Sequence, residues 1–350
     1  MTYFPLNTGA KIPAVGLGTW QSDGASCKLA VQTALEVGYR HLDCAHLYGN
    51  EIEVGQALGA ALNGGIPGLR REDVFVTSKF WCTTDTSKRV EMALTVSLKN
   101  LGVSYLDLYL VHWPVSSQVG DATDPPGNAT TELKKMSRRL KSIWRAMEAL
   151  VERGKVRAIG VSNFGISQIQ EVVSFARIIP AVNQVELHPF WRQDELVKFC
   201  QSKGIHVSAH TPLGFPGARL GSSGNLSSMG DDEVETRSQP IVFSRSRSVH
   251  APMLGTSAVA VIANRLRKTP AQVILRWGVQ RGTSVLPRSL KPERIKSNFD
   301  ILNWSLSDED WNSVNTMEPQ LRLIVSNQSY LGENGRPLQA VNEMDDVDFH

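Results

Sequence analysis

Four polar residues of different types stand at the ends of short apolar, strand-like runs in the first third of the chain. Asp43 closes one run, Tyr48 follows shortly after it, Lys79 closes the next run, and His112 directly follows a third. In a barrel of parallel strands the carboxyl ends converge on one face, where catalytic groups gather. A carboxylate, a phenol, an ammonium and an imidazole held together suit proton donation to a substrate oxygen. The combination predicts an enzyme.

Each of the four residues, taken alone, has an ordinary structural explanation. An aspartate or lysine at a strand end is more often a surface or capping residue. A histidine followed by Trp-Pro is more often a structural group, and a tyrosine at a helix start is commonly there for packing. Together and in this order, the four residues favour catalysis.

The rest of the chain alternates strand and helix signals, which favours a parallel barrel over an open sheet. We expect strands at residues 14–17, 40–43, 74–78, 106–111, 158–161, 182–186, 206–209 and 284–286. We expect helices at residues 27–37, 51–62, 87–101, 141–151, 168–175, 194–201 and 270–279, and a further helix capped by Ser307. Residues 6–13 read as a hairpin turn at the barrel bottom. The predicted fold is a (β/α)8 TIM barrel with an N-terminal hairpin and long loops on its catalytic face.

We expect residues 1–350 to form a single barrel domain, although two stretches break the alternation. Residues 115–135 are rich in Gly, Pro, Asp and Thr, and residues 215–255 are rich in Ser, Gly and Arg. Both follow strands, so both fall on the catalytic face. The middle of the second stretch, residues 222–248, has too little apolar content to fold alone, and we expect it to be poorly ordered.

Composition excludes several classes of protein. With 37 Lys and Arg against 34 Asp and Glu, the net charge of +3 argues against a nucleic-acid or membrane-surface partner. No apolar stretch is long enough to span a bilayer, and the opening residues lack the pattern of a secretory signal. The four cysteines form no CxxC pair, and no HExxH motif occurs, so we expect reduced thiols and no metal site. We therefore predict a cytoplasmic protein, and a monomer.

The chain resembles the aldo-keto reductases, most closely the plant-type members. The matching segments are Gly16-Leu-Gly-Thr-Trp20, Gly38-Tyr-Arg-His-Leu-Asp43, Tyr48-Gly-Asn-Glu51, Ser78-Lys79, Leu108-Tyr-Leu-Val-His-Trp-Pro114, Ile159-Gly-Val-Ser-Asn-Phe164, Val182-Asn-Gln-Val-Glu-Leu-His-Pro189, Trp191-Arg-Gln193, Val285-Leu-Pro-Arg-Ser289 and Pro292-Glu-Arg294. They span most of the chain in the family's order. The resemblance implies the (β/α)8 barrel, NADPH as cofactor, and reduction of aldehydes or ketones to alcohols.

In such a reaction each of the four polar residues has a separate role. The pKa of a tyrosine in water is ~10, and a nearby ammonium lowers it. We expect Lys79 to supply that ammonium and Asp43 to hold and orient it. Tyr48 would protonate the carbonyl oxygen as hydride reaches the carbon. A neutral His112 would donate a hydrogen bond that polarises and places the carbonyl.

The hydride carrier is not bound through a Rossmann fingerprint, because Gln21 stands where the third glycine would fall. By resemblance, Ser162, Asn163 and Gln184 bond the nicotinamide carboxamide, and Thr19 and Trp20 lie beside the cofactor. His210 stands where the family commonly has the tyrosine that stacks on the nicotinamide. The remaining contacts implied are Pro212, Leu213 and Gly214 at the pyrophosphate, Arg288, Ser289 and Arg294 at the 2′-phosphate, and Asn298 at the adenine. Guanidinium groups bind phosphate bidentately, which favours NADPH over NADH.

Aromatic side chains indicate the kind of substrate. Trp20, Trp81 and Trp113 each stand beside a strand end or one of the four polar residues, so they would wall a pocket for carbonyl compounds with apolar bodies. Trp144 and Trp277 fall in predicted helices and read as core. By resemblance, residues 318–350 supply the last wall of the pocket.

Two other residues depart from the family's usual pattern. The family usually has a lysine at Arg288, and Ser297 replaces a frequent acidic contact to the adenine. Two alternatives to a general carbonyl reductase also remain. One is a dedicated biosynthetic reductase acting on a polyketide or sugar-derived carbonyl, and the other is a catalytically weak nicotinamide-binding protein.

Overall fold

The computed structural model describes residues 2–81, 87–114, 129–214, 243–244 and 256–326. The chain opens with an antiparallel hairpin of β1 (Tyr3–Pro5) and β2 (Lys11–Pro13). Leu6 and Ile12 from this hairpin are buried against Phe75, Leu108 and other residues of the barrel strands. The predicted hairpin is therefore present, and it packs on the barrel interior.

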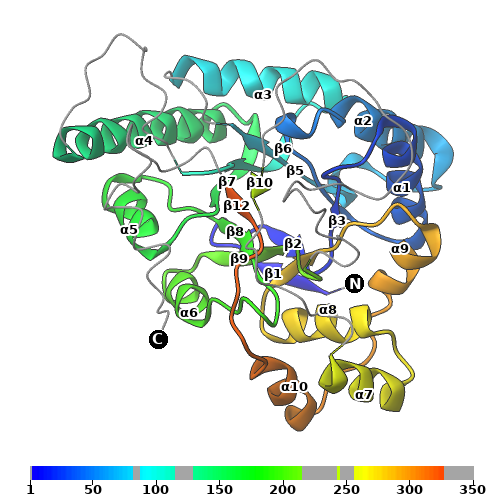
Figure 1. Cartoon of the computed structure of the whole chain (residues 1–350). Coiled ribbons are helices and arrows are strands. Elements are labelled where there is room, and N and C mark those ends of the chain that lie inside the picture. The colour runs from blue at the N-terminus through cyan, green and yellow to red at the C-terminus, as the bar shows by residue number, and fades with distance from the viewer. Residues whose placement is uncertain (1, 82–86, 115–128, 215–242, 245–255, 327–350) are drawn as a thin grey trace.

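Eight parallel strands form the barrel (Figure 1). In neighbour order they are β3 (Leu17–Gly18), β4 (His41–Asp43), β5 (Phe75–Phe80), β6 (Leu106–Val111), β7 (Val156–Ser162), β8 (Val182–Glu186), β9 (His206–His210) and β11 (Ser284–Leu286). Backbone bonds from Gly16 N–H to Val285 O and from Val285 N–H to Ala14 O, both 2.9 Å, join the last strand to the first. The predicted (β/α)8 barrel is confirmed, and seven strands lie in the expected places, while β3 overlaps the expected 14–17 only at Leu17.

Helices surround the strands (Figure 1). They are α1 (Gly24–Val37), α2 (Glu51–Ala60), α3 (Ser87–Leu101), α4 (Ala129–Glu152), α5 (Ile166–Phe175), α6 (Asp194–Ser202), α7 (Ser257–Leu266), α8 (Pro270–Gln280), α9 (Pro292–Phe299) and α10 (Asp308–Asn315). The cap predicted for α10 is present, because Ser307 Oγ accepts from Asp310 N–H at 3.1 Å. All seven predicted helices are present as well.

Three helices differ from the sequence-based expectation, and one of them, α9 at Pro292–Phe299, was not expected. Helix α4 begins at Ala129, inside the stretch expected to be a loop, and the apolar spacing of Leu133, Met136 and Leu140 in its polar first half was overlooked. Helix α7 was not expected, since it follows a Ser- and Gly-rich stretch. Its buried residues Val259, Ile262 and Ala263 are spaced for one helix face, which packs against α8 and α10.

The barrel strands are buried on both faces, as expected for parallel strands covered by helices. Every residue of β4, β5, β6 and β8 is buried. Trp144 on α4 and Trp277 on α8 are also fully buried, which confirms that both belong to the core. Polar residues among the strands therefore lie in a low-dielectric interior, where their partners determine their charge.

The two long loops fall largely outside the described residues. The predictions for 222–248 and for the C-terminal residues 327–350 are untested there, apart from one contact. Strand β10 (Phe243–Ser244) pairs antiparallel with β12 (Val325–Ser326), so part of the second stretch meets the C-terminal segment. Among the described residues, no helix has the length and apolar character needed to cross a membrane.

Candidate active site

Lys79 lies at the centre of the predicted catalytic group. Strands β4 and β5 pair with Asp43 opposite Thr77, which places Lys79 just beyond Asp43 toward the carboxyl ends. The Lys79 ammonium donates to Asp43 Oδ2 at 2.8 Å and to the Cys44 carbonyl at 2.9 Å. It also donates to the Tyr48 hydroxyl at 3.3 Å. The structure thus brings three of the four predicted residues into direct contact.

A short 3₁₀ turn, His46–Tyr48, carries the tyrosine to Lys79. Gly49 ends the turn with a φ of 69°, a left-handed conformation that glycine adopts without strain. The next residue, Asn50, is buried and donates to the Thr19 carbonyl at 2.8 Å and the Ser22 carbonyl at 3.1 Å. These bonds tie the turn to the loop after β3 and so hold Tyr48 in place.

His112 completes the group from the end of β6. Its backbone N–H donates to the Phe80 carbonyl at 2.9 Å, which continues the pairing of β5 with β6. The imidazole ring lies 5.7 Å from the Tyr48 ring and 5.3 Å from the Trp81 ring, edge-on to both, measured between centroids. All four predicted residues therefore meet at the carboxyl end of the barrel.

The charges of Lys79 and His112 follow from their surroundings. Burial alone would lower the pKa of Lys79, but the Asp43 carboxylate and the Tyr48 hydroxyl outweigh burial and raise it. Lys79 is therefore an ammonium although its side chain is 0% exposed. Burial holds the pKa of His112 well below its usual range, and the charge of Lys79 and the nearby His210 lower it further. The His112 imidazole is neutral, as expected.

The expectation for the pKa of Tyr48 was wrong in its net direction. Burial raises the pKa of Tyr48 to about 12, while the Lys79 ammonium works to lower it and the Asp43 carboxylate to raise it. Burial dominates because the phenolate would lose more hydration than one ammonium, already paired with Asp43, restores. The phenol consequently keeps its proton at neutral pH.

Amide side chains at the ends of β7 and β8 connect to this group. Gln184 Nε2 donates to Asp43 Oδ1 at 2.8 Å, and Ser162 Oγ donates to the Gln184 carbonyl at 2.8 Å. Asn163 Nδ2 donates to the His112 carbonyl at 3.0 Å. Asn163 has a φ of 63°, which non-glycine residues seldom adopt and which is a mark of functional sites. All three residues predicted at the carboxamide lie beside the catalytic group.

His210 ends β9 and is held at both ring nitrogens. Its Nε2 lies 2.9 Å from Asn163 Oδ1, and its Nδ1 lies 3.0 Å from Thr211 Oγ1. Burial lowers the pKa of His210 to about 4, so the ring is neutral. Thr211 has a φ of 53° and its carbonyl accepts from Gly214 N–H at 2.9 Å. Residues 211–214, with Pro212 and Leu213 at the bend, therefore form a tight turn directly after the strand.

The residues predicted at the adenosine end share the connection between β11 and α9. The Ser289 hydroxyl accepts from Lys291 N–H at 3.1 Å, one residue before α9 begins. Arg294 is exposed on the first turn of α9, and Asn298 is buried in its last turn. The Arg288 guanidinium donates to the Gln21 carbonyl in the loop after β3. Two cations thus flank a helix N-terminus, a favourable place for an anion.

The remaining predicted residues lie around the same end of the barrel. Thr19 Oγ1 donates to the Asp43 carbonyl at 2.9 Å. Trp113 is buried, whereas Trp20 and Trp81 are half-buried. The Trp81 ring contacts the ring of His112.

Sequence reasoning assigned no role to Glu51, although the residue lies in a quoted motif. Its buried carboxylate accepts from Ser78 Oγ at 2.7 Å and lies 3.6 Å from His46 Nδ1. Ser78 directly precedes Lys79, so Glu51 supports the strand end that carries the ammonium. The signal available in the sequence was an acidic residue at the start of a predicted helix, within the motif that also contains Tyr48.

Comparison with known proteins agrees with this geometry. The model of the Aldo/keto reductase family matches residues 14–318. The chain belongs to the aldo/keto reductase family. It is 42% identical to aldo-keto reductase family 4 member C11 of Arabidopsis thaliana over 342 residues, which cover 98% of this chain and 96% of that protein. It is 39% identical to aldo-keto reductase family 1 member A1 of Bos taurus, covering 97% of each chain. The plant-type and aldehyde reductase-like resemblance is confirmed.

Solved structures lead to the same assignment for this aldo-keto reductase. The structure of the aldose reductase from Schistosoma japonicum aligns with a TM-score of 0.72 and 37% identity, covering 90% of this chain and 92% of that one. An aldo/keto reductase from Brucella melitensis aligns with a TM-score of 0.69 and 33% identity, covering 90% and 98%. The chain is thus an oxidoreductase of a family that reduces small carbonyl compounds with nicotinamide cofactors, usually NADPH.

Proposed function

We propose that this protein reduces aldehydes and ketones to alcohols with NADPH, and that Tyr48 is the proton donor. The observation that carries the proposal is the contact of the Tyr48 hydroxyl with a fully buried ammonium, Lys79, itself held by Asp43. Such a contact stabilises negative charge on the phenol oxygen as the proton leaves. A tyrosine in a purely structural role has no need of a buried cation at its oxygen.

The donor groups of the chain fit NADPH. Ser162 and Asn163 lie at the end of β7 and Gln184 lies on the neighbouring β8, and their hydroxyl and amide groups suit a carboxamide. Arg288, Ser289 and Arg294 surround the start of α9, where two guanidinium groups, a hydroxyl and the helix dipole suit a phosphate dianion. We place the nicotinamide beside His210 and the 2′-phosphate at α9, with the 211–214 turn between them at the pyrophosphate.

The bound cofactor supplies the hydride, and the side chains of the site handle the proton. Neutral His112 donates a hydrogen bond to the carbonyl oxygen, which orients the carbonyl and draws electron density from its carbon. Tyr48 keeps its proton until negative charge develops on that oxygen and then transfers it. Lys79 stabilises the phenolate left behind, while Asp43 and the Cys44 carbonyl prevent the ammonium from moving away.

The substrate class is proposed from the pocket walls. Trp81 stands against His112, and Trp20 and Trp113 lie next to strand ends of the same face. Aromatic walls favour substrates whose carbonyl carries an apolar body, such as aromatic or medium-chain aldehydes. The polarisable tryptophan surfaces contact the apolar body of the substrate, and hydrogen bonds from Tyr48 and His112 hold its carbonyl oxygen.

The test is oxidation of NADPH measured against a panel of aldehydes, ketones, sugars and dicarbonyls. We expect turnover with several aldehydes and the best kcat/KM with apolar ones. Turnover confined to one sugar-derived or polyketide carbonyl would instead indicate a dedicated biosynthetic reductase. Tight NADPH binding with no turnover across the panel would contradict the proposal and indicate a nicotinamide-binding protein.

A further inference from the structure

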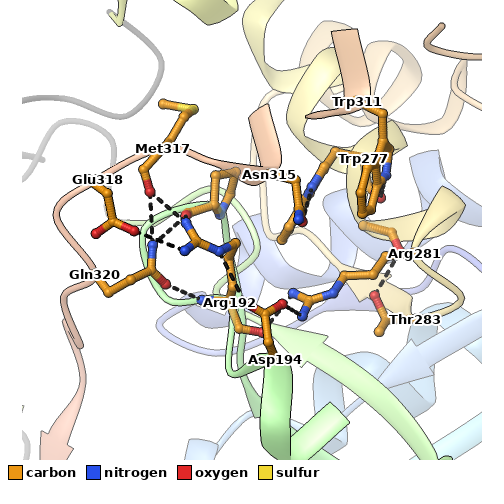
Figure 2. Close-up of polar contacts among 12 residues, drawn as sticks. Arg192, Asp194, Trp277, Arg281, Thr283, Trp311, Asn315, Met317, Glu318 and Gln320 are labelled. Carbon is orange, nitrogen blue, oxygen red and sulfur yellow. Dashed lines mark hydrogen bonds and ion pairs between the residues drawn. The ribbon is translucent and has the colours of Figure 1, made fainter. Parts of the chain in front are cut away.

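A segment near the C-terminal end of the described chain is fastened to the loop after β8. This strap (residues 317–324) follows α10, and Arg192 holds it from the β8–α6 connection (Figure 2). Arg192 Nη1 donates to the Met317 carbonyl at 2.6 Å, and Nη2 pairs with Glu318 at 2.9 Å. The Gln320 side chain accepts from Arg192 N–H at 2.7 Å and donates to the Pro189 carbonyl at 3.0 Å.

The far end of the strap is held by one buried carboxylate, that of Glu186. Leu323 N–H donates to Glu186 Oε1 at 2.7 Å, and Ile324 N–H donates to Oε2 at 2.7 Å. His188 Nε2 lies 2.8 Å from Oε1. Glu186 is 3% exposed and ends β8. Both oxygens of a buried acid are thus used to hold backbone groups from a segment far away in the sequence.

We propose that Glu186 is a positioning residue which fixes the strap as a wall of the substrate pocket. The proposal rests on the proposed function, because it concerns the pocket of the same reaction. Glu186 lies on the strand that carries Gln184, whose amide bonds the catalytic Asp43. The same strand therefore connects the catalytic group to the strap.

Further observations place the strap at the site. Burial is the main cause of the lowered pKa of His210, and the charges of Lys79 and, more weakly, of Arg322 on the strap lower it further, so Arg322 lies in the neighbourhood of His210. Ile324 is buried next to the Glu186 carboxylate. The chain then continues into β12, which pairs with β10 from the segment after β9. The strap thus runs along the ends of β8 and β9, beside the predicted nicotinamide position.

The chemistry of the carboxylate suits this role. A carboxylate accepts at both oxygens, whereas the glutamine amide has one accepting oxygen and an NH2 group that faces a backbone N–H unfavourably. Burial alone would raise the pKa of Glu186, but the hydrogen bonds from His188 and Leu323 contribute to lowering it overall, so the acid is ionised at neutral pH. Glu186→Gln keeps the side-chain shape and releases one of the two strap contacts.

The first experiment measures Glu186→Gln with an aromatic aldehyde and with a short aliphatic aldehyde. We expect KM for the aromatic aldehyde to rise by about tenfold, which corresponds to the loss of one charge-assisted hydrogen bond. KM for the short aldehyde should change less, because this substrate does not reach the pocket wall. The Kd for NADPH and the kcat with saturating short aldehyde should stay within about twofold of their wild-type values. The control is Glu91→Gln, which removes an exposed carboxylate on α3 that pairs with Arg153. An unchanged KM, or an equal loss in KM, kcat and NADPH affinity, would overturn the proposal.

Hydrogen exchange of the Leu323 and Ile324 amides gives a readout that needs no turnover. Both amides should be protected in the wild-type protein and lose protection in Glu186→Gln, while the β5 amides stay protected. Should Glu186→Gln fail to fold, Leu323→Pro removes one donor and leaves the acid intact, and it should raise the same KM. Unprotected wild-type amides, or an unchanged KM in Leu323→Pro, would contradict the role of Glu186. A wild-type protein without turnover but with protected amides would contradict only the proposed function.

Discussion

Lys79 is the residue on which the other catalytic side chains depend. Its ammonium is fully buried and contacts a carboxylate, a carbonyl and a phenol at once. A buried ammonium is stable only when it is paired and hydrogen-bonded. The three contacts meet that condition, and the tyrosine among them becomes the group whose charge can change during a reaction.

The first prediction concerns the proton donor. Tyr48→Phe should lower kcat by about 10²-fold or more, because the carbonyl oxygen loses its acid, while the Kd for NADPH changes little. Steady-state kinetics and a fluorescence titration with NADPH check this, with the exposed Tyr3→Phe as control. Substantial turnover by the phenylalanine variant would rule out Tyr48 as the donor.

The second prediction concerns the ammonium. Lys79→Met should also abolish most turnover, because without the positive charge the pKa of Tyr48 would rise further above about 12. The variant should be less stable by about 3–5 kcal/mol, since Asp43 is left as an uncompensated buried charge. Thermal melting and kinetics measure the two effects, with Lys99→Met on the exposed face of α3 as control. An active, fully stable variant would contradict the role of Lys79.

At the scale of elements, the strand ends carry the side chains that we propose for different parts of the reaction. Strands β4, β5 and β6 present the catalytic group, β7 and β8 the amides, β9 the imidazole and the following turn, and β11 leads into α9. Helix α9 begins with Pro292, a residue favoured at a first helical position, directly after Ser289 and Lys291. The residues proposed for the 2′-phosphate therefore lie just before the helix or in its first turn.

The third prediction tests this phosphate site. Arg294→Ala should raise KM for NADPH by about ten- to a hundredfold, the value of one charge-assisted contact, and should leave KM for NADH nearly unchanged. Arg288 is the poorer choice, because it also donates to the Gln21 carbonyl and its loss would disturb the loop after β3. Arg153→Ala on the surface is the control. Equal losses for both cofactors would show that Arg294 has only a structural role.

At the scale of the whole molecule, the barrel interior holds several histidines without charge. Burial lowers the pKa of His41 and of His206 to about 3, and that of His210 to about 4. In the unfolded chain each would titrate near its ordinary pKa of ~6.5. At pH values between the folded-state and the unfolded-state pKa, the unfolded chain binds more protons than the folded protein, so acid favours unfolding.

The fourth prediction follows from that difference. Stability should be full above pH ~6.5 and should fall as the pH drops below it, by up to about 1.4 kcal/mol per pH unit for each buried histidine. Denaturant melts between pH 7 and 5 measure the slope in a range where carboxylates remain ionised. His206→Gln should make the slope shallower, since one titrating group is removed. The same slope in both proteins would show that His206 is protonated in the folded state.

The sequence alone determined the barrel and the positions of the residues that we propose as catalytic. Alternating strand and helix signals imply parallel strands, and parallel strands bring their carboxyl ends together, so Asp43, Lys79 and His112 could be placed on one face without knowledge of any contact. The same reasoning did not predict helix α7, because its short apolar pattern adjoins a polar stretch.

Only the tertiary structure decided the charges and the long-range contacts. The net rise in the pKa of Tyr48 depends on how deeply the assembled barrel buries the phenol, which no local pattern records. The bonds from Glu186 to Leu323 and Ile324, and from Arg288 to Gln21, join segments that are distant in the chain. Local sequence sets which groups are available, whereas packing sets which groups lose water and which partners replace it.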